Sequence, residues 1–423
     1  MTGDATAATD LRGSAGGRIF ISVCEASADV HAAALVRAAR EQLPRAVFYG
    51  LTGPRLRALG VETVYDFASH AAMLSGVLGV LGRAYAALRV VERSWRAQRP
   101  DVVVLLDSPE LHLKFARRAR ALGIPVLYYI APQTWASRAY RNRQIVRDID
   151  RLACILPFEE GYFAGIKGSR DQGNEGFRAE FVGHPLFETL RQEHPDAATV
   201  AGLRTQAAGR PLVALLPGSR GHVIDTMLPL QLAVVRRLRA AGQDVHAVIS
   251  CVSAEQRERI EGLRAADGEG KVDILVADNA SLLTAADLVL VASGTATLHV
   301  AYYRRPMVVM YDAGRLVYWP YRLLRRWLVT TPHLSLMNIL AGARIVPEFM
   351  PFVRDVDEIA GVARQLLTDT TWRALMTRQL DEIVRPLEQG TASARVCELI
   401  EELIAAMGGE HAASSQPVGR LLA

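Results

Sequence analysis

The stretch Leu212 to Gly221, LVALLPGSRG, is the part of the sequence that decides the fold. Its first five residues are apolar at every position, which is typical of a strand buried on both faces, as in parallel sheets covered by helices. Proline and glycine then end the strand, and a helical pattern is expected over residues 225–241. The stretch therefore predicts one strand–turn–helix unit of a doubly wound α/β fold.

Similar strand and helix patterns alternate on both sides of this stretch. Before it, strands are expected at residues 18–24, 46–49, 101–106, 125–130 and 151–156, and after it at residues 245–250, 272–276, 288–291 and 307–310. Neither half contains the GxGxxG fingerprint of dinucleotide-binding domains. The pattern therefore favours α/β architecture of the GT-B type, with two Rossmann-like, doubly wound parallel-sheet domains facing a cleft, over a dehydrogenase.

A polar stretch between residues 181 and 211 marks the expected boundary between the two domains. The sequence predicts a disordered N-terminal segment at 1–17, a first domain at 18–205, a second domain at 206–375, C-terminal helices that close the fold at 376–407, and a disordered tail at 408–423. Two domains also suit the length of 423 residues, since a single core stops growing at about 250–300 residues.

Composition and charge exclude several classes of protein. Half of the residues are hydrophobic and 22% are charged, as in a folded α/β enzyme. The formal net charge of +5 suits a phosphate-bearing ligand or an anionic membrane surface, whereas no basic run interleaved with aromatic residues indicates nucleic acid. The four cysteines lack CxxC or zinc spacing, so we expect no metal site, no disulfide framework and a cytoplasmic location. No apolar run is long enough to span a bilayer.

The second domain is expected to hold a diphosphate between two loops. Residues 218–220 follow the strand quoted above, and residues 293–295 follow the strand at 288–291, so both loops lie at the carboxyl ends of parallel strands. Backbone amides at such helix starts bind anions, and an arginine can pair with phosphate. Each loop alone could equally be an ordinary turn or a helix cap. Their occurrence together favours the phosphate site.

In the first domain, polar side chains follow two of the expected strands. Asp107 comes directly after the buried strand DVVVLL, where a general base would lie at the sheet edge that faces the cleft. Glu25, Ser27 and Asp29 follow the first strand at the equivalent edge. Asp107 could instead cap the next helix, and Ser27 or Asp29 could also be caps.

Two stretches have the composition of membrane-interface contacts. Residues 71–82 carry no charge and are followed by several arginines, and residues 317–329 mix aromatic residues with arginines. Each could equally be a buried helix or an amphipathic helix packed on the protein. A peripheral membrane contact is therefore one of two interpretations that the sequence leaves open.

Several ordered motifs resemble those of the lipid-A-disaccharide synthase family: CEASADVH, LLDSPELH, IAPQTWA, FVGHPL, LLPGSRG, SGTATL and SLMNILAG, over about residues 19–404. The resemblance implies an inverting GT-B glycosyltransferase of lipid A biosynthesis, peripheral at the inner face of the cytoplasmic membrane. Such an enzyme transfers 2,3-diacylglucosamine from UDP to 2,3-diacylglucosamine 1-phosphate and releases UDP. The first domain would bind the acceptor and the second the UDP-sugar.

The resemblance also implies which residues form the site. The catalytic residues it implies are Asp107, Arg220 and Asn338. The substrate-binding residues it implies are Glu25, Ser27, Asp29, Trp135, His184, Gly218, Ser219, Ser293, Gly294, Thr295 and His299. Taken alone, His31, His112 and His184 are each more typical of a satisfied surface or loop histidine. No metal ion, cofactor or nucleic acid is implied; the partners are the acylated UDP-glucosamine donor, the acylated glucosamine 1-phosphate acceptor and a membrane surface, and a homodimer stays open.

Several positions depart from the family pattern. Cys24 replaces a glycine, Glu110 an aspartate, His112 an asparagine, and Val223 and His299 replace glutamates. A histidine at position 299 can hydrogen-bond the ribose hydroxyls of the donor, as the family's carboxylate does, but without its charge. The departures leave three interpretations open: the same reaction, a paralogue acting on another UDP-sugar as a transferase or epimerase, and a non-catalytic membrane-associated relative.

Overall fold

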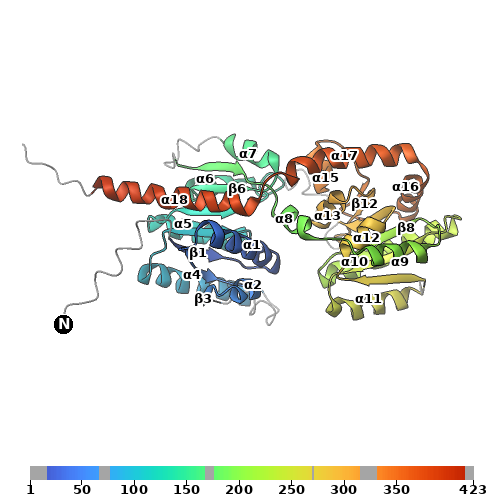
Figure 1. The fold of residues 1–423 in the computed structure, drawn as a ribbon, viewed down its shortest axis with the longest axis horizontal. Helices are drawn as coiled ribbons and strands as arrows, with labels where there is room; N and C mark the ends of the chain where they lie inside the picture. Colours follow the sequence, from blue (N-terminus) through green and yellow to red (C-terminus); the bar gives the residue numbers. More distant parts are fainter. Residues whose placement is uncertain (1–16, 66–76, 167–175, 269–270, 315–330, 415–423) are drawn as a thin grey trace, which may run out of the picture. The chain divides into compact units, whose positions relative to one another are not determined.

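The computed structural model describes residues 17–65, 77–166, 176–268, 271–314 and 331–414. Contacts divide the chain into two compact units, one made of residues 1–185 and 390–423 and the other of residues 186–389. Each unit is a parallel sheet with helices on its faces (Figure 1). The predicted α/β fold with two doubly wound parallel sheets is therefore confirmed.

The first unit contains a seven-stranded sheet in the order β3-β2-β1-β4-β5-β6-β7. Its strands are β1 Arg18–Ser22, β2 Val47–Leu51, β3 Glu62–Tyr65, β4 Val102–Leu106, β5 Val126–Tyr129, β6 Arg151–Cys154 and β7 Arg178–Phe181. Its helices are α1 Ala26–Gln42, α2 Pro54–Ala58, α4 Val77–Ala97, α5 Pro109–Ala121, the 3-10 turn η2 Ala139–Arg141, α6 Asn142–Asp148, α7 Pro157–Ala164 and α18 Ala392–Ser414.

Apolar side chains fill the core of this unit. Every residue of β4 is buried, as expected of a strand covered on both faces. Trp95 packs edge-on against Phe20 with ring centroids 5.1 Å apart, and it also meets Phe115. The C-terminal helix α18 packs along α1 and contacts β4 and β5. The last helix of the chain thus covers the first unit.

The second unit contains a six-stranded sheet in the order β10-β9-β8-β11-β12-β13. Its strands are β8 Leu212–Leu216, β9 His246–Cys251, β10 Val272–Val276, β11 Leu288–Ala292, β12 Met307–Met310 and β13 Glu348–Phe349. Its helices are α8 Pro185–Gln192, α9 Ala197–Ala207, α10 Gly221–Ala240, α11 Ala254–Asp267, α12 Asn279–Ala285, α13 Ala296–Tyr302, α15 Leu336–Ala341, α16 Val356–Thr368 and α17 Thr370–Glu388.

The strand order of each sheet reverses once. In the first sheet β1 lies between β2 and β4, and in the second β8 lies between β9 and β11. Ser22 is paired with Leu105, and Leu216 with Val291, so the loops that follow these neighbouring strands begin side by side. Open α/β sheets bind ligands in the crevice at this reversal. The fold therefore places the loops after β1 and β4, and those after β8 and β11, where ligands are expected.

The units differ from the domain boundaries expected at 205 and 376. The first unit ends at Pro185, because α8 and α9 pack onto the second unit; Phe187 of α8 meets Tyr302 of α13 with ring centroids 5.8 Å apart. The C-terminal helices are also divided, since α17 belongs to the second unit and α18 to the first. Helix α18 continues to Ser414, past the expected start of the tail at 408. Residues 1–16 and 415–423 lie outside the described residues.

Candidate functional site

The loop after β8 is built around Gly218. Its φ of +107° favours glycine, and a Cβ at this position would lie 3.0 Å from Cγ1 of Val223, which packs against the loop. Helix α10 begins at Gly221, and its 20 residues direct the positive end of the helix dipole at the loop. Ser219 and Arg220 are exposed at this end. The loop therefore has the features of an anion site.

The loop after β11 offers fewer backbone N–H groups to an anion than the sequence predicted. The N–H of Ser293 donates to the carbonyl of Met310 at 3.0 Å, so this amide is already used. Gly294 and Thr295 are exposed, but α13, which follows them, has only seven residues and is much shorter than α10. The prediction that the N–H of Ser293 belongs to an anion-binding amide cluster is wrong, while Gly294 and Thr295 stay predicted contacts.

His299 faces a carboxylate that the sequence analysis missed. Its Nε2 lies 3.2 Å from Oε2 of Glu193, which comes from the segment after α8. Both side chains line a cavity of about 340 Å³ at the carboxyl ends of β9 and β10, together with Asp278 and Asn279. Position 299 lacks the family's carboxylate, but the second unit provides one beside it from position 193. No local pattern relates two positions so far apart in the sequence.

Asn338 is completely buried, and its hydrogen-bonding groups are all occupied. Its Nδ2 donates to the carbonyl of Val346 at 3.0 Å and to Oε2 of Glu348 at 2.9 Å, and its Oδ1 accepts from the N–H groups of Ile345 and Val346 at 2.9 and 3.0 Å. A primary amide has two donor hydrogens and two acceptor lone pairs. In this conformation Asn338 clamps the 345–348 segment and has no group left for the catalytic contact that the resemblance implied.

Asp107 occupies a tight left-handed turn after β4. Its φ is 54° and that of Ser108 is 49°, and two such non-glycine residues cost about 1–2 kcal/mol each. The carbonyl oxygen of Asp107 accepts from the hydroxyl of Tyr128 at 2.5 Å and from Nδ1 of His112 at 2.7 Å. Ser108, and not Asp107, is the N-cap residue of α5. The turn holds Asp107 at the sheet edge rather than using it as the cap.

His112 fixes this turn from inside the first unit. Because a carbonyl only accepts, Nδ1 carries the proton, and Nε2 then accepts from the hydroxyl of Ser22 at 2.8 Å and lies 3.4 Å from Sγ of Cys24. Burial lowers the pKa of His112 to about 4, so the ring is neutral. The sequence indicated a surface or loop histidine here, which is wrong because the side chain is completely buried.

Glu25 and Ser27 lie beside the Asp107 turn. Glu25 is the N-cap residue of α1, and both side chains are exposed where β1 ends next to β4. Burial, with smaller contributions from the negative charges of Glu25 and Asp107, raises the pKa of the Cys24 thiol to about 12. These effects require that the two carboxylates lie near Cys24. The structure therefore brings Glu25 and Asp107 together at one edge, as predicted from the strand order.

Asp29 has a structural partner instead. Only 2% of its surface is exposed, and its carboxylate accepts from the N–H groups of Arg55 at 2.8 Å and Leu56 at 3.2 Å. These N–H groups belong to the first turn of α2, where a carboxylate is favourable. Asp29 therefore caps α2 from its position in α1.

Trp135 and His184 are also inside the first unit. The Nε1 of Trp135 donates to Glu159 at 2.9 Å, and burial raises the pKa of that carboxyl to about 7. Burial, with a smaller contribution from nearby His31, lowers the pKa of His184 to about 3. Both residues are less than 10% exposed. Trp135 and His184 both have neighbours inside the first unit, and their contacts with substrate stay predictions.

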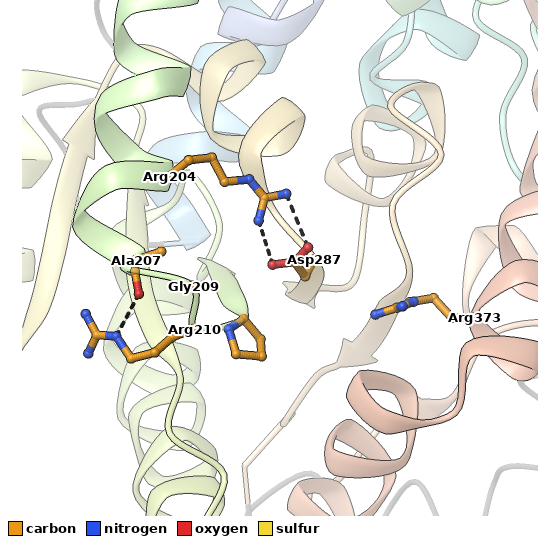
Figure 2. Close-up of a pocket in the computed structure, with 7 residues that line it drawn as sticks. Arg204, Ala207, Gly209, Arg210, Asp287 and Arg373 are labelled. Atoms are coloured by element: carbon orange, nitrogen blue, oxygen red, sulfur yellow. Dashed lines mark hydrogen bonds and ion pairs between the residues drawn. The ribbon is translucent and has the colours of Figure 1, made fainter.

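A different cavity of about 280 Å³ lies at the amino ends of β8 and β11 (Figure 2). There Arg204 contacts Asp287 through two N–H···O hydrogen bonds of 2.8 and 3.2 Å, and Arg210 turns back to the carbonyl of Ala207. The predicted ligand loops lie at the opposite ends of the same strands. This cavity is therefore separate from the candidate site.

Within the described ranges, no group of three or more His, Cys, Asp or Glu side chains is placed to hold a metal ion. None of the helices in that part of the chain is both long and apolar enough to cross a membrane. Of the two predicted membrane contacts, residues 317–329 and residues 71–76 lie outside the described residues, and residues 77–82 belong to helix α4.

Known proteins resemble this chain over nearly all of its length. A family model described as lipid-A-disaccharide synthetase matches residues 19–397. The chain belongs to the lipid-A-disaccharide synthase family. The lipid-A-disaccharide synthase of Myxococcus xanthus (strain DK1622) is 35% identical over 393 residues, which cover 92% of this chain and 97% of that protein. That of Pseudomonas aeruginosa (strain UCBPP-PA14) is 34% identical over 392 residues, with 92% and 98% covered.

Membership of this family makes the chain a glycosyltransferase of lipid A biosynthesis, and the predicted family is confirmed. Solved structures also share the fold. MurG of Acinetobacter baumannii matches with a TM-score of 0.53 at 17% identity, covering 91% of this chain and 99% of that one. The UDP-GlcNAc 2-epimerase of Neisseria meningitidis matches with a TM-score of 0.54 at 10% identity, covering 92% and 99%. At such identities the likeness confirms the GT-B fold alone.

Proposed function

We propose that this synthase-family chain transfers 2,3-diacylglucosamine from UDP to 2,3-diacylglucosamine 1-phosphate, with inversion at the anomeric carbon and without a metal ion. One observation carries the proposal: the first unit holds Asp107 in a supported turn, and the second holds the loop at 218–220 at the start of α10. Each lies at the strand-order reversal of its own sheet, where open α/β folds bind ligands.

The loop at the start of α10 is proposed to bind the diphosphate of the donor. The first N–H groups of a helix have no partner within the helix and attract anions. Arg220 can pair with phosphate through two N–H groups and offset the charge on departing UDP. The hydroxyl of Ser293 and the N–H groups of Gly294 and Thr295 form the proposed second contact. Such charges and dipoles replace a divalent cation.

Asp107 is proposed as the general base in the first unit. It accepts the proton of the acceptor's 6-hydroxyl as that oxygen attacks the anomeric carbon of the donor. The bond from this carbon to the diphosphate breaks, its electron pair leaves on UDP, and a single displacement inverts the centre. Glu25 and Ser27, exposed beside the turn, are proposed to contact the acceptor. Because both substrates carry acyl chains, we place the reaction at the inner face of the cytoplasmic membrane.

A product assay by mass spectrometry tests the proposal. The purified chain is given the acylated UDP-glucosamine and the acylated glucosamine 1-phosphate in the presence of EDTA. We expect equal amounts of disaccharide 1-phosphate and UDP. Activity that EDTA abolishes and manganese restores would show that the metal-independent scheme is wrong. Conversion of UDP-GlcNAc alone to an epimer would identify the epimerase alternative, and no UDP binding by calorimetry would identify a non-catalytic relative.

A further inference from the structure

We propose that Glu193, positioned against His299, binds the ribose hydroxyls of the donor nucleotide and makes the second unit selective for ribonucleotides. The inference rests on the proposed function, because it requires a nucleoside diphosphate at the start of α10. It concerns a residue outside the motifs that the family resemblance covers. The case depends on where Glu193 lies, which charges surround it, and which of its atoms a ligand can reach.

The position of the cavity fits the nucleoside part of such a ligand. Val252 follows β9, residues 277–280 follow β10, and His299 lies one turn into the helix after β11. The loop at 218–220 follows β8, which lies between β9 and β11 in the sheet. The cavity therefore opens at the same sheet edge as the anion loop. Its volume of about 340 Å³ is within the usual range for small-molecule sites.

The charge of the cavity lining differs from that of the anion loop. Glu193 and Asp278 line it, and none of its described lining residues is a lysine or arginine. Two carboxylates repel phosphate, so the part of the ligand that enters here must be neutral and able to donate hydrogen bonds. Ribose hydroxyls have this chemistry, and a carboxylate accepts from two vicinal hydroxyls through its two oxygens.

Of the two carboxylates, Glu193 is better placed to bind a ligand. Oδ1 of Asp278 accepts from the N–H of Ser281 at 3.0 Å and caps α12. Glu193 has no such capping role, and 34% of its side chain is exposed. His299 contacts Oε2 of Glu193, while the His299 ring packs near Tyr303, with centroids 5.7 Å apart, and is only 14% exposed. Because His299 contacts Oε2, we assign the contact with a ribose hydroxyl to Oε1.

Isothermal calorimetry with UDP, 2′-deoxy-UDP and 3′-deoxy-UDP tests the inference. We expect the wild-type chain to bind UDP about 10- to 150-fold more tightly than at least one deoxy analogue, the range for a hydrogen bond to a charged group. Glu193→Gln should lose most of this preference by weakening UDP binding alone. If Glu193→Gln binds the deoxy analogue with the same affinity as the wild-type chain, its fold and its phosphate contacts are intact.

A carboxylate swap sharpens the test. Because the side chains of residues 193 and 299 meet, Glu193→Gln combined with His299→Glu should restore a preference for UDP. Glu382→Gln, an exposed glutamate of α17 in the same unit, is the matched control and should behave as wild type. A preference that survives Glu193→Gln unchanged would overturn the inference and leave the proposed function standing. If the wild-type chain does not bind UDP at all, the proposed function fails as well.

Discussion

The role of Asn338 leads to the sharpest prediction. Asn338→Ala removes both acceptor contacts from the N–H groups of Ile345 and Val346 and both donor contacts to Val346 and Glu348. All of these groups lie around a side chain with no exposed surface. Leaving a buried backbone donor without a partner costs about 1–3 kcal/mol. The N–H of Ile345 also donates to the carbonyl of Ala343 at 3.1 Å, so the loss falls mainly on the N–H of Val346. We therefore expect the 345–348 segment to lose about 2 kcal/mol of local stability.

Amide hydrogen exchange measured by mass spectrometry reads this loss directly. A loss of about 2 kcal/mol corresponds to roughly 30-fold faster exchange at the amide of Val346. Asn142→Ala is the control, because Asn142 is also buried but lies in the first unit, where its Nδ2 donates to the hydroxyl of Tyr162 at 2.8 Å. It should leave exchange at 345–348 unchanged. Normal protection in Asn338→Ala, with turnover lowered by more than about 10²-fold, would refute the clamp and favour direct contact with substrate.

Three further predictions follow from the first unit. Asp107→Asn should lower turnover by about 10²- to 10⁴-fold, the usual range for a positioned base, while the calorimetric affinity for UDP stays unchanged; near-normal turnover would show that Asp107 is not the base. Asp29→Ala should lower the free energy of unfolding of the first unit by about 3 kcal/mol, because the buried N–H of Leu56 and the partly buried N–H of Arg55 lose a charged acceptor. A urea midpoint equal to wild type would contradict this. The pKa of His112 is about 4 in the folded chain and 6.5 in the unfolded chain. About 3 kcal/mol of the free energy of unfolding is therefore present above pH 6.5 and is lost as the pH falls towards 4. Urea unfolding from pH 7 to 4 should therefore show falling stability, with a shallower fall in His112→Asn; equal slopes for both chains would exclude the buried, neutral histidine.

The sequence predicted the strands well because burial on both faces leaves a continuous apolar run. The strands Leu212–Leu216, Val272–Val276 and Met307–Met310 have the predicted bounds, and the other predicted strands differ by one or two residues at their ends. Parallel pairing then determines which loops meet, since the carboxyl ends of neighbouring strands share one edge. The grouping of Glu25 with Asp107 could therefore be predicted without knowing any side-chain contact.

The partners of buried polar residues could not be predicted in the same way. Asp29, Asn338 and His112 each bind groups from other elements, and no periodic pattern encodes which distant N–H or carbonyl a side chain will meet. The domain boundary was missed for a related reason. The sequence pattern of helix α18 does not show which unit it packs on, and only its contacts with α1 show that it belongs to the first unit.

The positions that depart from the family pattern lie in contact with groups that compensate for them. Cys24 lies 3.4 Å from His112, so two departures meet beneath the Asp107 turn. Val223 fills the space beside Gly218, and Glu110 pairs with Arg141 at 3.1 Å. A relative without activity has no need to keep the backbone conformation of its former active site when the side chains around it change.

The Asp107 turn keeps an unfavourable backbone conformation through contacts with its neighbours. Two successive left-handed residues are unfavourable and persist only where surrounding contacts enforce them, which occurs mainly at functional sites. Here the hydroxyl of Tyr128 and the ring of His112 enforce the turn at its carbonyl oxygen. Because the substituted residue at position 112 is itself one of the supports, the change at that position keeps the aspartate in place. The departures therefore favour a transferase whose site has been rebuilt over a relative that has lost its chemistry.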